Sequence, residues 1–366
     1  MSYFLVPTDN GYNIAQVAHI VRGTVNRLAP LGIPFSHLIT VSDGYVAGLE
    51  QHSANLRIKW ARIGPDGVLT YLPTIGLPPH LVVSALALHG SYLYVGGTLN
   101  HLGWHAQQNL PTAGRFNLGA DTPVWEPLEL PRDVETSPGK AIDDVLVDSG
   151  ELILVDDLVF PKYLFVYALP TGAALPSNPR IINLPFGRVY EHIHKGQVSP
   201  GYVALYSTST GMFGNGTYVS VLRRGDYTPL VVFAYEEARE ELSALERMSP
   251  LASDPRPCPF DLALQDHTLV VACPRALVCV DLRVFERPSV GDHFVAENES
   301  IPYWDYPTVD LRDPTVVPGV TWVALPLDER PDGVRFVGPG QLLLTASTQA
   351  TGSSGMYWLK KIESYD

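Results

Sequence analysis

The chain of 366 residues has little charge, few basic residues and few cysteines, and each shortage excludes a class of protein. Charged residues make up 17% of the chain, and 38 acidic side chains outnumber 25 basic ones, for a formal net charge of −13. A nucleic-acid binder needs a basic surface that displaces counterions, and an anionic membrane surface attracts the same sign. We therefore expect an acidic, soluble protein that binds neither nucleic acid nor membrane.

The three cysteines, Cys258, Cys273 and Cys279, are an odd number without C-x-x-C spacing. This usage is typical of a reducing compartment, where a thiol within an apolar strand behaves as a small hydrophobic group. No segment approaches the roughly 18 apolar residues of a membrane-spanning helix. The first ten residues lack the basic and apolar regions of a secretory signal. The sequence therefore predicts a cytoplasmic protein.

What the chain does have is turn residues, 31 glycines and 32 prolines, and a repeated hairpin. Six blocks each consist of an apolar strand, a turn and a second apolar strand: 38–49, 86–97, 145–155, 198–205, 262–272 and 334–344. A hairpin cannot bury its apolar faces alone, whereas repeated hairpins bury them against one another. The repeat therefore predicts an all-β protein, a β-propeller.

Third and fourth apolar segments follow most of these blocks, which matches the four-stranded antiparallel blade of a propeller. We predict a single propeller domain over 1–366 with six blades, at about 35–73, 80–130, 140–185, 188–234, 258–318 and 319–366, the last completed by 1–8. A seventh blade is the alternative, because 1–34 and 289–318 can each contain irregular strands. The short strand 3–6 has no partner of its own, so we expect it to close the last blade.

One segment departs from the β pattern. Residues 234–248 are rich in helix-forming residues and carry an apolar row at Ala234, Ala238, Leu242 and Leu245. Glutamates crowd the first turns and Pro250 follows the last one, as at the ends of a helix. We predict a helical insert that packs on the propeller, with a partner-docking helix as the alternative.

Two segments resemble known propeller repeats. Residues 93–97, with their paired glycines, are similar to a kelch blade, and residues 164–175 are similar to the strand and turn of quinoprotein-type repeats. Each motif occurs once, so the resemblance is to the β-propeller superfamily over most of the chain and to no family within it. It implies loops from several blades on two faces.

Few residues have the spacing of a catalytic or metal site. His192 and His194 alternate along a strand and are candidate metal ligands, but a site needs three or four convergent ligands. The acidic residues Asp143, Asp144 and Asp156 invite a glycosidase or calcium site. We interpret Asp156 instead as a residue of a solvated turn. We expect the protein to bind no metal and no cofactor, and we assign no catalytic residue from the sequence.

Aromatic residues in loops are the best candidates for a protein interface. The first group, which prolines bracket, consists of Tyr303, Trp304, Asp305 and Tyr306. The second group, on another blade, consists of Trp104 and His105. Tyrosine and tryptophan are enriched at binding hot spots, although aromatic side chains can also attach a long insert to its own fold.

These observations favour a non-enzymatic scaffold subunit that binds one or more proteins in a cytosolic assembly. The alternatives are a hydrolase or lyase that acts on a sugar or lactone in a central channel, and a sensor of a small ligand. A propeller enzyme draws its residues from distant blades, so sequence spacing cannot decide among these functions.

Overall fold

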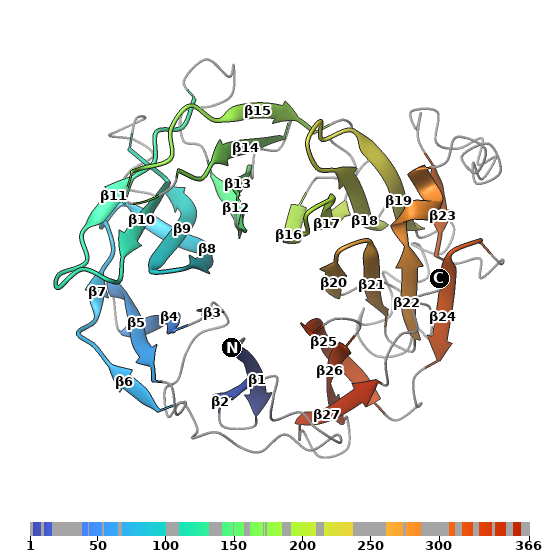
Figure 1. Cartoon of the computed structure of the whole chain (residues 1–366), viewed down its shortest axis with the longest axis horizontal. Coiled ribbons are helices and arrows are strands. Elements are labelled where there is room, and N and C mark those ends of the chain that lie inside the picture. Colours follow the sequence, from blue (N-terminus) through green and yellow to red (C-terminus); the bar gives the residue numbers. More distant parts are fainter. Residues whose placement is uncertain are drawn as a thin grey trace, which may run out of the picture. The chain divides into compact units, whose positions relative to one another are not determined.

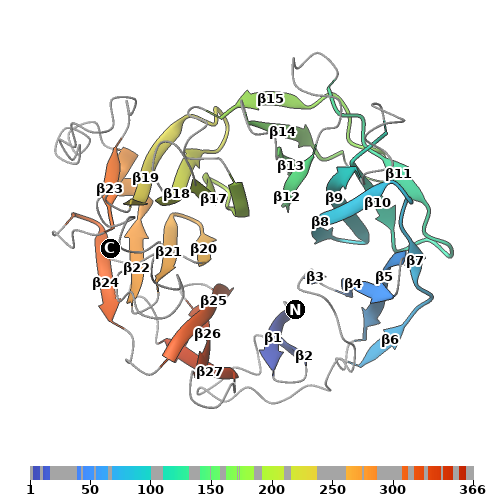
Figure 2. The ribbon, with the colours of Figure 1, turned by 180° about the vertical axis from the view of Figure 1, so that it is seen from behind.

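The computed structural model describes residues 3–8, 11–16, 39–42, 44–52, 55–64, 68–99, 110–131, 141–148, 150–156, 162–170, 172, 174–184, 192–209, 216–236, 261–273, 276–286, 307–311, 317–324, 329–338, 341–348 and 354–359. The chain divides into two compact units, Met1–Asn183 and Leu184–Asp366. Nearly all regular structure in these residues is β-strand, and the strands form successive antiparallel sheets (Figures 1 and 2). None of the described residues forms a helix of the length and hydropathy needed to cross a membrane.

The first unit contains four sheets in its described residues. The first is the hairpin of β1 (Tyr3–Thr8) and β2 (Gly11–Gln16). The second joins β3 (Ile39–Ser42), β4 (Tyr45–His52), β5 (Asn55–Ile63) and β6 (Leu69–Tyr71), with β7 (Ile75–Gly76) also on β5. The third contains β8 (Leu81–His89), β9 (Tyr92–Leu99), β10 (Ala113–Asn117) and β11 (Trp125–Pro127). The fourth contains β12 (Ile142–Val147), β13 (Glu151–Asp156), β14 (Tyr163–Ala168) and β15 (Arg180–Asn183).

The described residues of the second unit form three sheets. One joins β16 (His192–Val198), β17 (Tyr202–Ser209), β18 (Gly216–Arg223), β19 (Pro229–Glu236) and β23 (Thr308–Asp310). The next joins β20 (Asp261–Gln265), β21 (Thr268–Cys273), β22 (Ala276–Asp281) and β24 (Val320–Ala324). The last contains β25 (Glu329–Gly338), β26 (Gln341–Thr348) and β27 (Ser354–Leu359). A short 3-10 helix, η2 (Leu282–Glu286), follows β22.

Turn chemistry and burial explain the hairpins that the sequence predicted. Gly44, Gly90 and Asp266 have φ angles of 102°, 57° and 49°, a left-handed region that glycine and aspartate tolerate well in tight turns. Strand β8 alternates between buried and more exposed residues, whereas β18 is buried almost throughout. Continuous burial is expected where a strand is covered on both faces by neighbouring sheets. All six predicted hairpins are confirmed as strand pairs.

The hydrophobic cores lie between neighbouring sheets of each unit. In the first unit, one core joins Trp60 and Ile75 to Leu93 and Phe116 of the following sheet. In the second, a core of nineteen buried residues includes Phe233, Val271 and Leu311. Burying one such side chain contributes about 1.5–3 kcal/mol, so packing between sheets is the main source of stability.

The paired glycines of the kelch-like segment are explained by close packing. A β-carbon on Gly96 would lie 2.6 Å from Cγ2 of Ile142, which belongs to the next sheet. A β-carbon on Gly97 would overlap the carbonyl oxygen of Val82 on the neighbouring strand. Both positions therefore need glycine because a backbone or a neighbouring sheet approaches closely, and neither has a positive φ angle.

Three details differ from the sequence predictions. Ala234–Glu236 are the last residues of β19 and not the start of a helix, because pairing with β18 outweighs helix propensity there; the rest of the predicted helix lies outside the described residues. Strand β1 pairs with β2 and is not a strand of the last sheet. Val320–Ala324, assigned to the sixth blade from sequence, pairs with β22 in the sheet before it. The single-domain boundary stays a prediction.

The chain between β22 and β24 makes an excursion to the neighbouring sheet. Phe285 of η2 packs edge-on against Phe233 of β19, with ring centroids 6.1 Å apart. The chain then adds β23 to the outer edge of β19 as a parallel strand, with Val309 and Leu311 buried in the shared core. Only after this does it return to complete its own sheet with β24. These residues form a strap across two sheets.

The two described cysteines, Cys273 and Cys279, are buried thiols outside any disulfide, as the sequence suggested. Burial raises the pKa of Cys279 from 9.0 to about 11. We expect Cys279 to resist iodoacetamide at pH 8 in the native protein and to react rapidly in denaturant, because only the thiolate attacks. Labelling followed by peptide mass spectrometry measures both rates; equal rates would contradict the buried position.

Since the raised pKa favours the neutral folded thiol, its contribution to stability should be lost between pH 9 and pH 11.

Candidate binding groove

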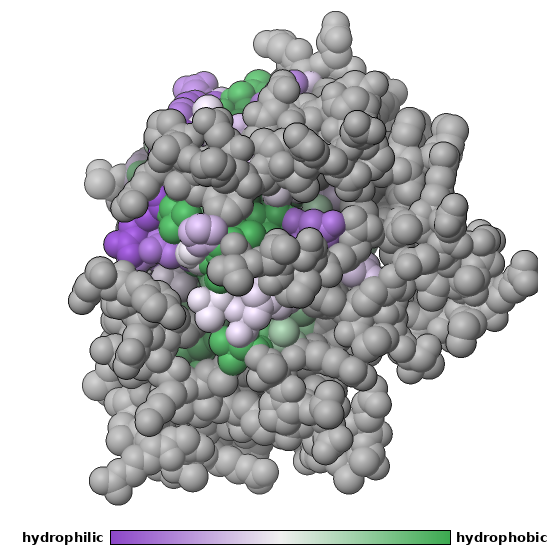
Figure 3. Space-filling view, turned by 90° about the vertical axis from the view of Figure 1, so that its right-hand side faces the viewer, coloured by the Kyte–Doolittle hydropathy of each residue, from purple (hydrophilic) through white to green (hydrophobic). Residues whose placement is uncertain are grey.

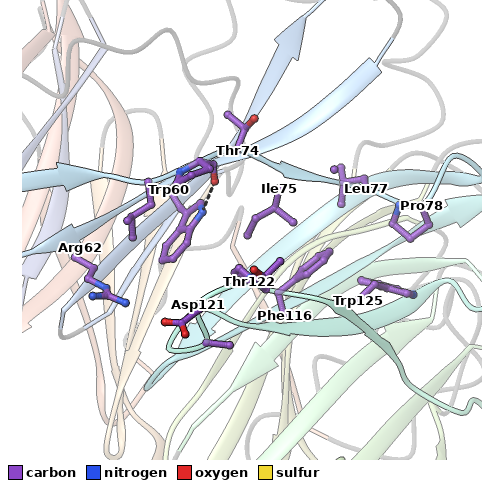
Figure 4. Close-up of a pocket in the computed structure, with 15 residues that line it drawn as sticks. Trp60, Arg62, Thr74, Ile75, Leu77, Pro78, Phe116, Asp121, Thr122 and Trp125 are labelled. Carbon is purple, nitrogen blue, oxygen red and sulfur yellow. Dashed lines mark hydrogen bonds between the residues drawn. The ribbon is translucent and has the colours of Figure 1, made fainter.

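A groove of about 700 Å³ lies in the first unit, between the sheet of β5–β7 and the sheet of β10–β11. Its lining includes the partly exposed Trp125 and the prolines Pro73, Pro78 and Pro123, while the core side chains of Trp60, Ile75 and Phe116, at most 6% exposed, lie at its base (Figure 4). The volume falls within the range of about 300–1,000 Å³ that is usual for ligand sites. We name it the aromatic groove.

The aromatic side chains of the groove are held by specific contacts. The indole N–H of Trp60 donates to the carbonyl of Pro73 at 2.9 Å (Figure 4). The rings of Phe116 and Trp125 lie 5.2 Å apart at 53°. Gly114 lies beneath Trp125, where a β-carbon would overlap the ring. The rings are therefore positioned before a ligand arrives, which lowers the entropic cost of binding.

Buried polar contacts support one wall from behind. Arg115, on β10, is 2% exposed, and its Nε donates to Glu126 Oε2 on β11 at 2.6 Å. Its guanidinium also lies 4.1 Å from the centroid of the Tyr92 ring. Although Arg115 is desolvated, its bonds to Glu126 and Tyr94 raise its pKa. This network holds β10 and β11 together at the groove.

Charge is concentrated toward one end of the groove. Figure 4 shows Arg62 at the end opposite Leu77, Pro78 and Trp125, with Asp121 nearer Arg62. Both Arg62 and Asp121 are exposed, and in the part of the chain that the structure describes neither forms an ion pair. The groove therefore offers an apolar surface next to charges that are available to a ligand.

Exposed apolar side chains surround the groove. Val124, between the lining residues Pro123 and Trp125, is 67% exposed, and Tyr71, next to Leu72, is 43% exposed. The described residues that are visible in Figure 3 form hydrophobic and hydrophilic areas side by side. Apolar exposure beside a preformed groove is typical of an interaction surface.

The aromatic residues chosen from sequence lie elsewhere. Trp104, His105 and the segment Tyr303, Trp304, Asp305 and Tyr306 are outside the described residues, so their interface role stays a prediction. The carbonyl of Pro307, which follows that segment, accepts from the N–H of Val232 at 2.9 Å.

The two candidate metal ligands are exposed on β16. The His192 and His194 rings lie 6.5 Å apart, and Ile193 between them is buried. His194 Nε2 is hydrogen-bonded to Thr208 Oγ1 at 2.7 Å, and its ring lies 5.4 Å from that of Tyr206. Among the described residues, no three His, Cys, Asp or Glu side chains are placed to hold a metal ion.

A β-bulge recurs in the first strands of four sheets and was not predicted. The register shifts at Ser84, Asp143, His194 and Asp332. The bulge lies at the same distance from the hairpin turn in all four sheets. In each, the residue before the bulge pairs with the fifth residue after the first turn-closing residue of the second strand. A bulge turns a side chain away from the regular alternation. Ser84 uses this to donate to the carbonyl of Ile142 in the next sheet.

The acidic residues of β12 and β13 differ from the sequence interpretation. Asp156 is fully buried at the end of β13, and not in a solvated turn. Asp143, in the bulge of β12, forms an ion pair with the fully buried Lys162, with 3.6 Å between Oδ2 and Nζ. The positive charge that pairs with Asp143 belongs to Lys162, which lies ten or more residues further along the chain. A search of the sequence for neighbouring carboxylates therefore does not find this ion pair.

Comparison with known proteins places this arrangement in a fold class. No protein-family model and no curated protein matches the sequence. A solved protein from Lactobacillus plantarum is 13% identical, with 98% of this chain and 95% of that chain covered and a TM-score of 0.52. A structure from a study of prolyl endopeptidases is 11% identical, covers 96% of this chain and 46% of its own length, and has a TM-score of 0.42.

A Bacteroides fragilis protein assigned provisionally as a 6-phosphogluconolactonase is 12% identical over 76% of this chain and 90% of that chain, with a TM-score of 0.36. Likenesses this distant concern the fold and carry no activity across. The successive four-stranded antiparallel sheets define a fold of the β-propeller type, and the likeness to the Lactobacillus plantarum structure concerns this fold alone. The chain is a β-propeller-type protein.

Proposed function

We propose that this protein is a non-enzymatic binding subunit that holds a protein partner in the aromatic groove. The observation that carries the proposal is a preformed groove with the partly exposed Trp125 in its lining and the exposed Arg62 at its charged end. Tryptophan and arginine are the residues most enriched at binding hot spots. The hydrolase or lyase alternative stays a prediction.

Gly76 offers a way to block the groove without disturbing the fold. It lies on the two-residue strand β7, it lines the groove, and a β-carbon there would meet no atom within 4 Å. Gly201, in a turn of the second unit, has equally open surroundings and no positive φ angle. The pair Gly76→Phe and Gly201→Phe therefore compares the same substitution inside and outside the groove.

We expect Gly76→Phe to reduce capture of a specific partner by about tenfold or more, the loss of roughly 1.4 kcal/mol of binding free energy, because the ring occupies the partner's place. Gly201→Phe should leave capture unchanged, and both variants should melt near the wild-type temperature. The measurement is quantitative mass spectrometry of proteins captured from the native host by the three forms. A partner captured equally by all three would contradict the proposed role of the groove.

A further inference from the structure

Strand β24 is the outer strand of its sheet in the second unit, and no described strand pairs with its other side (Figures 1 and 2). Its five residues include neither a charge nor a proline, and its register with β22 has no bulge. Charges, prolines and bulges usually protect a sheet edge from pairing with another chain. Edges of the first unit have such protection, since β11 ends at Pro127 and β15 begins with the exposed Arg180. The edge of β24 is therefore suited to strand addition.

The backbone of β24 presents hydrogen-bonding groups at this edge. Just before the strand, the N–H of Asp281 donates to the carbonyl of Gly319 at 2.9 Å. Hydrogen-bonded and non-hydrogen-bonded pairs alternate along an antiparallel ladder, so Thr321 and Val323 are the residues of β24 that bond to β22. The backbone groups that point away from β22 belong to the alternate residues Val320, Trp322 and Ala324.

One of these outward groups already has a partner. The N–H of Val320 donates to the carbonyl of Val317 at 3.0 Å, which agrees with its outward direction. Within the described residues, no backbone carbonyl accepts from the N–H groups of Trp322 and Ala324. These two donors and the neighbouring carbonyls form the unpaired row that an added strand needs.

The apolar side chains of β24 are incompletely covered. Val320 and Trp322 pack against the core of nineteen buried residues, and Val323 packs against a core shared with β25 and β26. All three are only partly buried, and Thr321 is exposed. A strand beside β24 would remove more of this apolar surface from water, which favours its addition.

Strand β23 indicates which kind of segment suits an outer edge in this unit. It adds to the edge of β19, where Val309 is buried and the residues on either side of it are partly exposed. Val309 and Leu311 belong to the same core against which Trp322 packs. A segment that alternates apolar and polar residues can therefore continue this core beside β24.

We propose that β24 is a docking edge at which an extended segment of a partner protein adds as a fifth strand. The segment alternates apolar and polar residues, as β23 does. In this mode of recognition, main-chain hydrogen bonds give the affinity and side-chain contacts give the specificity. The edge belongs to the second unit and the aromatic groove to the first, so this inference does not depend on the proposed function.

Backbone N-methylation of a peptide tests the inference on the full-length protein. The probe is a fluorescein-labelled peptide of alternating valine and threonine, with lysines at one end for solubility. Every second N–H of an added strand points toward its neighbour, so methylating one alternate set should weaken binding about tenfold or more. Methylating the other set should leave binding unchanged. Equal effects of the two sets, or no saturable binding of the unmethylated peptide, would overturn the inference.

Two substitutions at one position test the edge from the protein side. Ala324→Pro removes an outward donor but no bond to β22, and proline is tolerated at such edge positions. Ala324→Ser keeps the donor. We expect the proline variant to bind the peptide at least tenfold more weakly and the serine variant to bind normally, with both melting near the wild-type temperature. Thr321→Lys, which adds a protective charge at an exposed position, should also weaken binding. Equal binding by all forms would contradict the proposed edge.

Amide hydrogen exchange and sedimentation identify what occupies the edge. In the free protein, the amides of Trp322 and Ala324 should exchange faster than those of Thr321 and Val323, and the peptide should slow only the first two. A second copy of this chain could supply the strand, but each copy carries a net charge of −13 and the copies repel. Sedimentation should therefore show a monomer. Slow exchange at Trp322 in the monomer, or a dimer that Ala324→Pro dissociates, would overturn the partner segment.

Discussion

Replacing Asp261 with alanine is expected to lower the free energy of unfolding by about 1–3 kcal/mol, because it leaves the backbone N–H of Val334 without its acceptor and removes the ion pair of the partly exposed Lys195. Asp261, on β20, is 8% exposed and connects three sheets of the second unit. Its Oδ1 pairs with Lys195 Nζ of β16, and its Oδ2 accepts from the N–H of Val334 of β25 at 2.8 Å. Urea unfolding followed by fluorescence measures the loss.

Companion variants separate the two roles of Asp261. Asp261→Asn can still accept from Val334, so we expect a smaller loss than for alanine. Asp261→Leu combined with Lys195→Met removes both charges, and it should recover part of the loss because no unpaired charge remains. Asp121→Ala, at an exposed position without a positive φ angle, controls for the loss of a carboxylate. A loss below about 1 kcal/mol for Asp261→Ala would show that the three-sheet contact is not structural.

Lys162→Met should cost more, about 3–5 kcal/mol, because it removes the fully buried cation that pairs with the largely buried carboxylate of Asp143. The Lys162 side chain is fully buried and that of Asp143 is 18% exposed. Methionine keeps the length and most of the apolar contacts of the lysine, so the measured loss reports mainly on charge. Denaturant unfolding of the two proteins at pH 7 gives the difference.

The same substitution at Lys59 provides the matched control. Lys59 pairs with Glu50 at 3.8 Å, and both side chains are about one quarter exposed, at 27% and 23%. An ion pair of this exposure contributes about 0–1 kcal/mol, so Lys59→Met should change stability little. Losses of equal size at the two lysines would contradict a special role for the buried pair.

The hairpins could be predicted from sequence because their signals are local. The turn at Gly90, for example, lies between apolar segments of strand length, and β8 and β9 follow at the expected positions. The bulges could not be predicted in the same way. Asp143 lies at the register shift between Ile142 and Asp144 of β12, and nothing in the neighbouring sequence marks that position.

The aromatic groove was missed for a related reason. Trp60 and Trp125 are separated by more than sixty residues and belong to different sheets, so sequence gives no sign that they share a cavity. Thr308–Asp310 were missed as a strand because three residues show no periodicity, and their pairing with β19 is parallel and distant in sequence. Contacts between residues of different sheets cannot be predicted from a single sequence, whereas contacts between residues close along the chain can.

The strap has a consequence for how this protein can change over evolution. In a simple array of repeats, each unit contacts its neighbours only through packed surfaces, so a repeat can be duplicated or deleted as one piece of gene. Here the strap carries β23 into the sheet of β16–β19 before β24 completes the sheet of β20–β22. Excising the chain from β20 to β24 as a block would remove β23 from the other sheet, and excising β16–β19 would leave β23 without its partner strand. These two sheets are therefore inherited together, and new copies of the repeat can be accommodated only outside the pair.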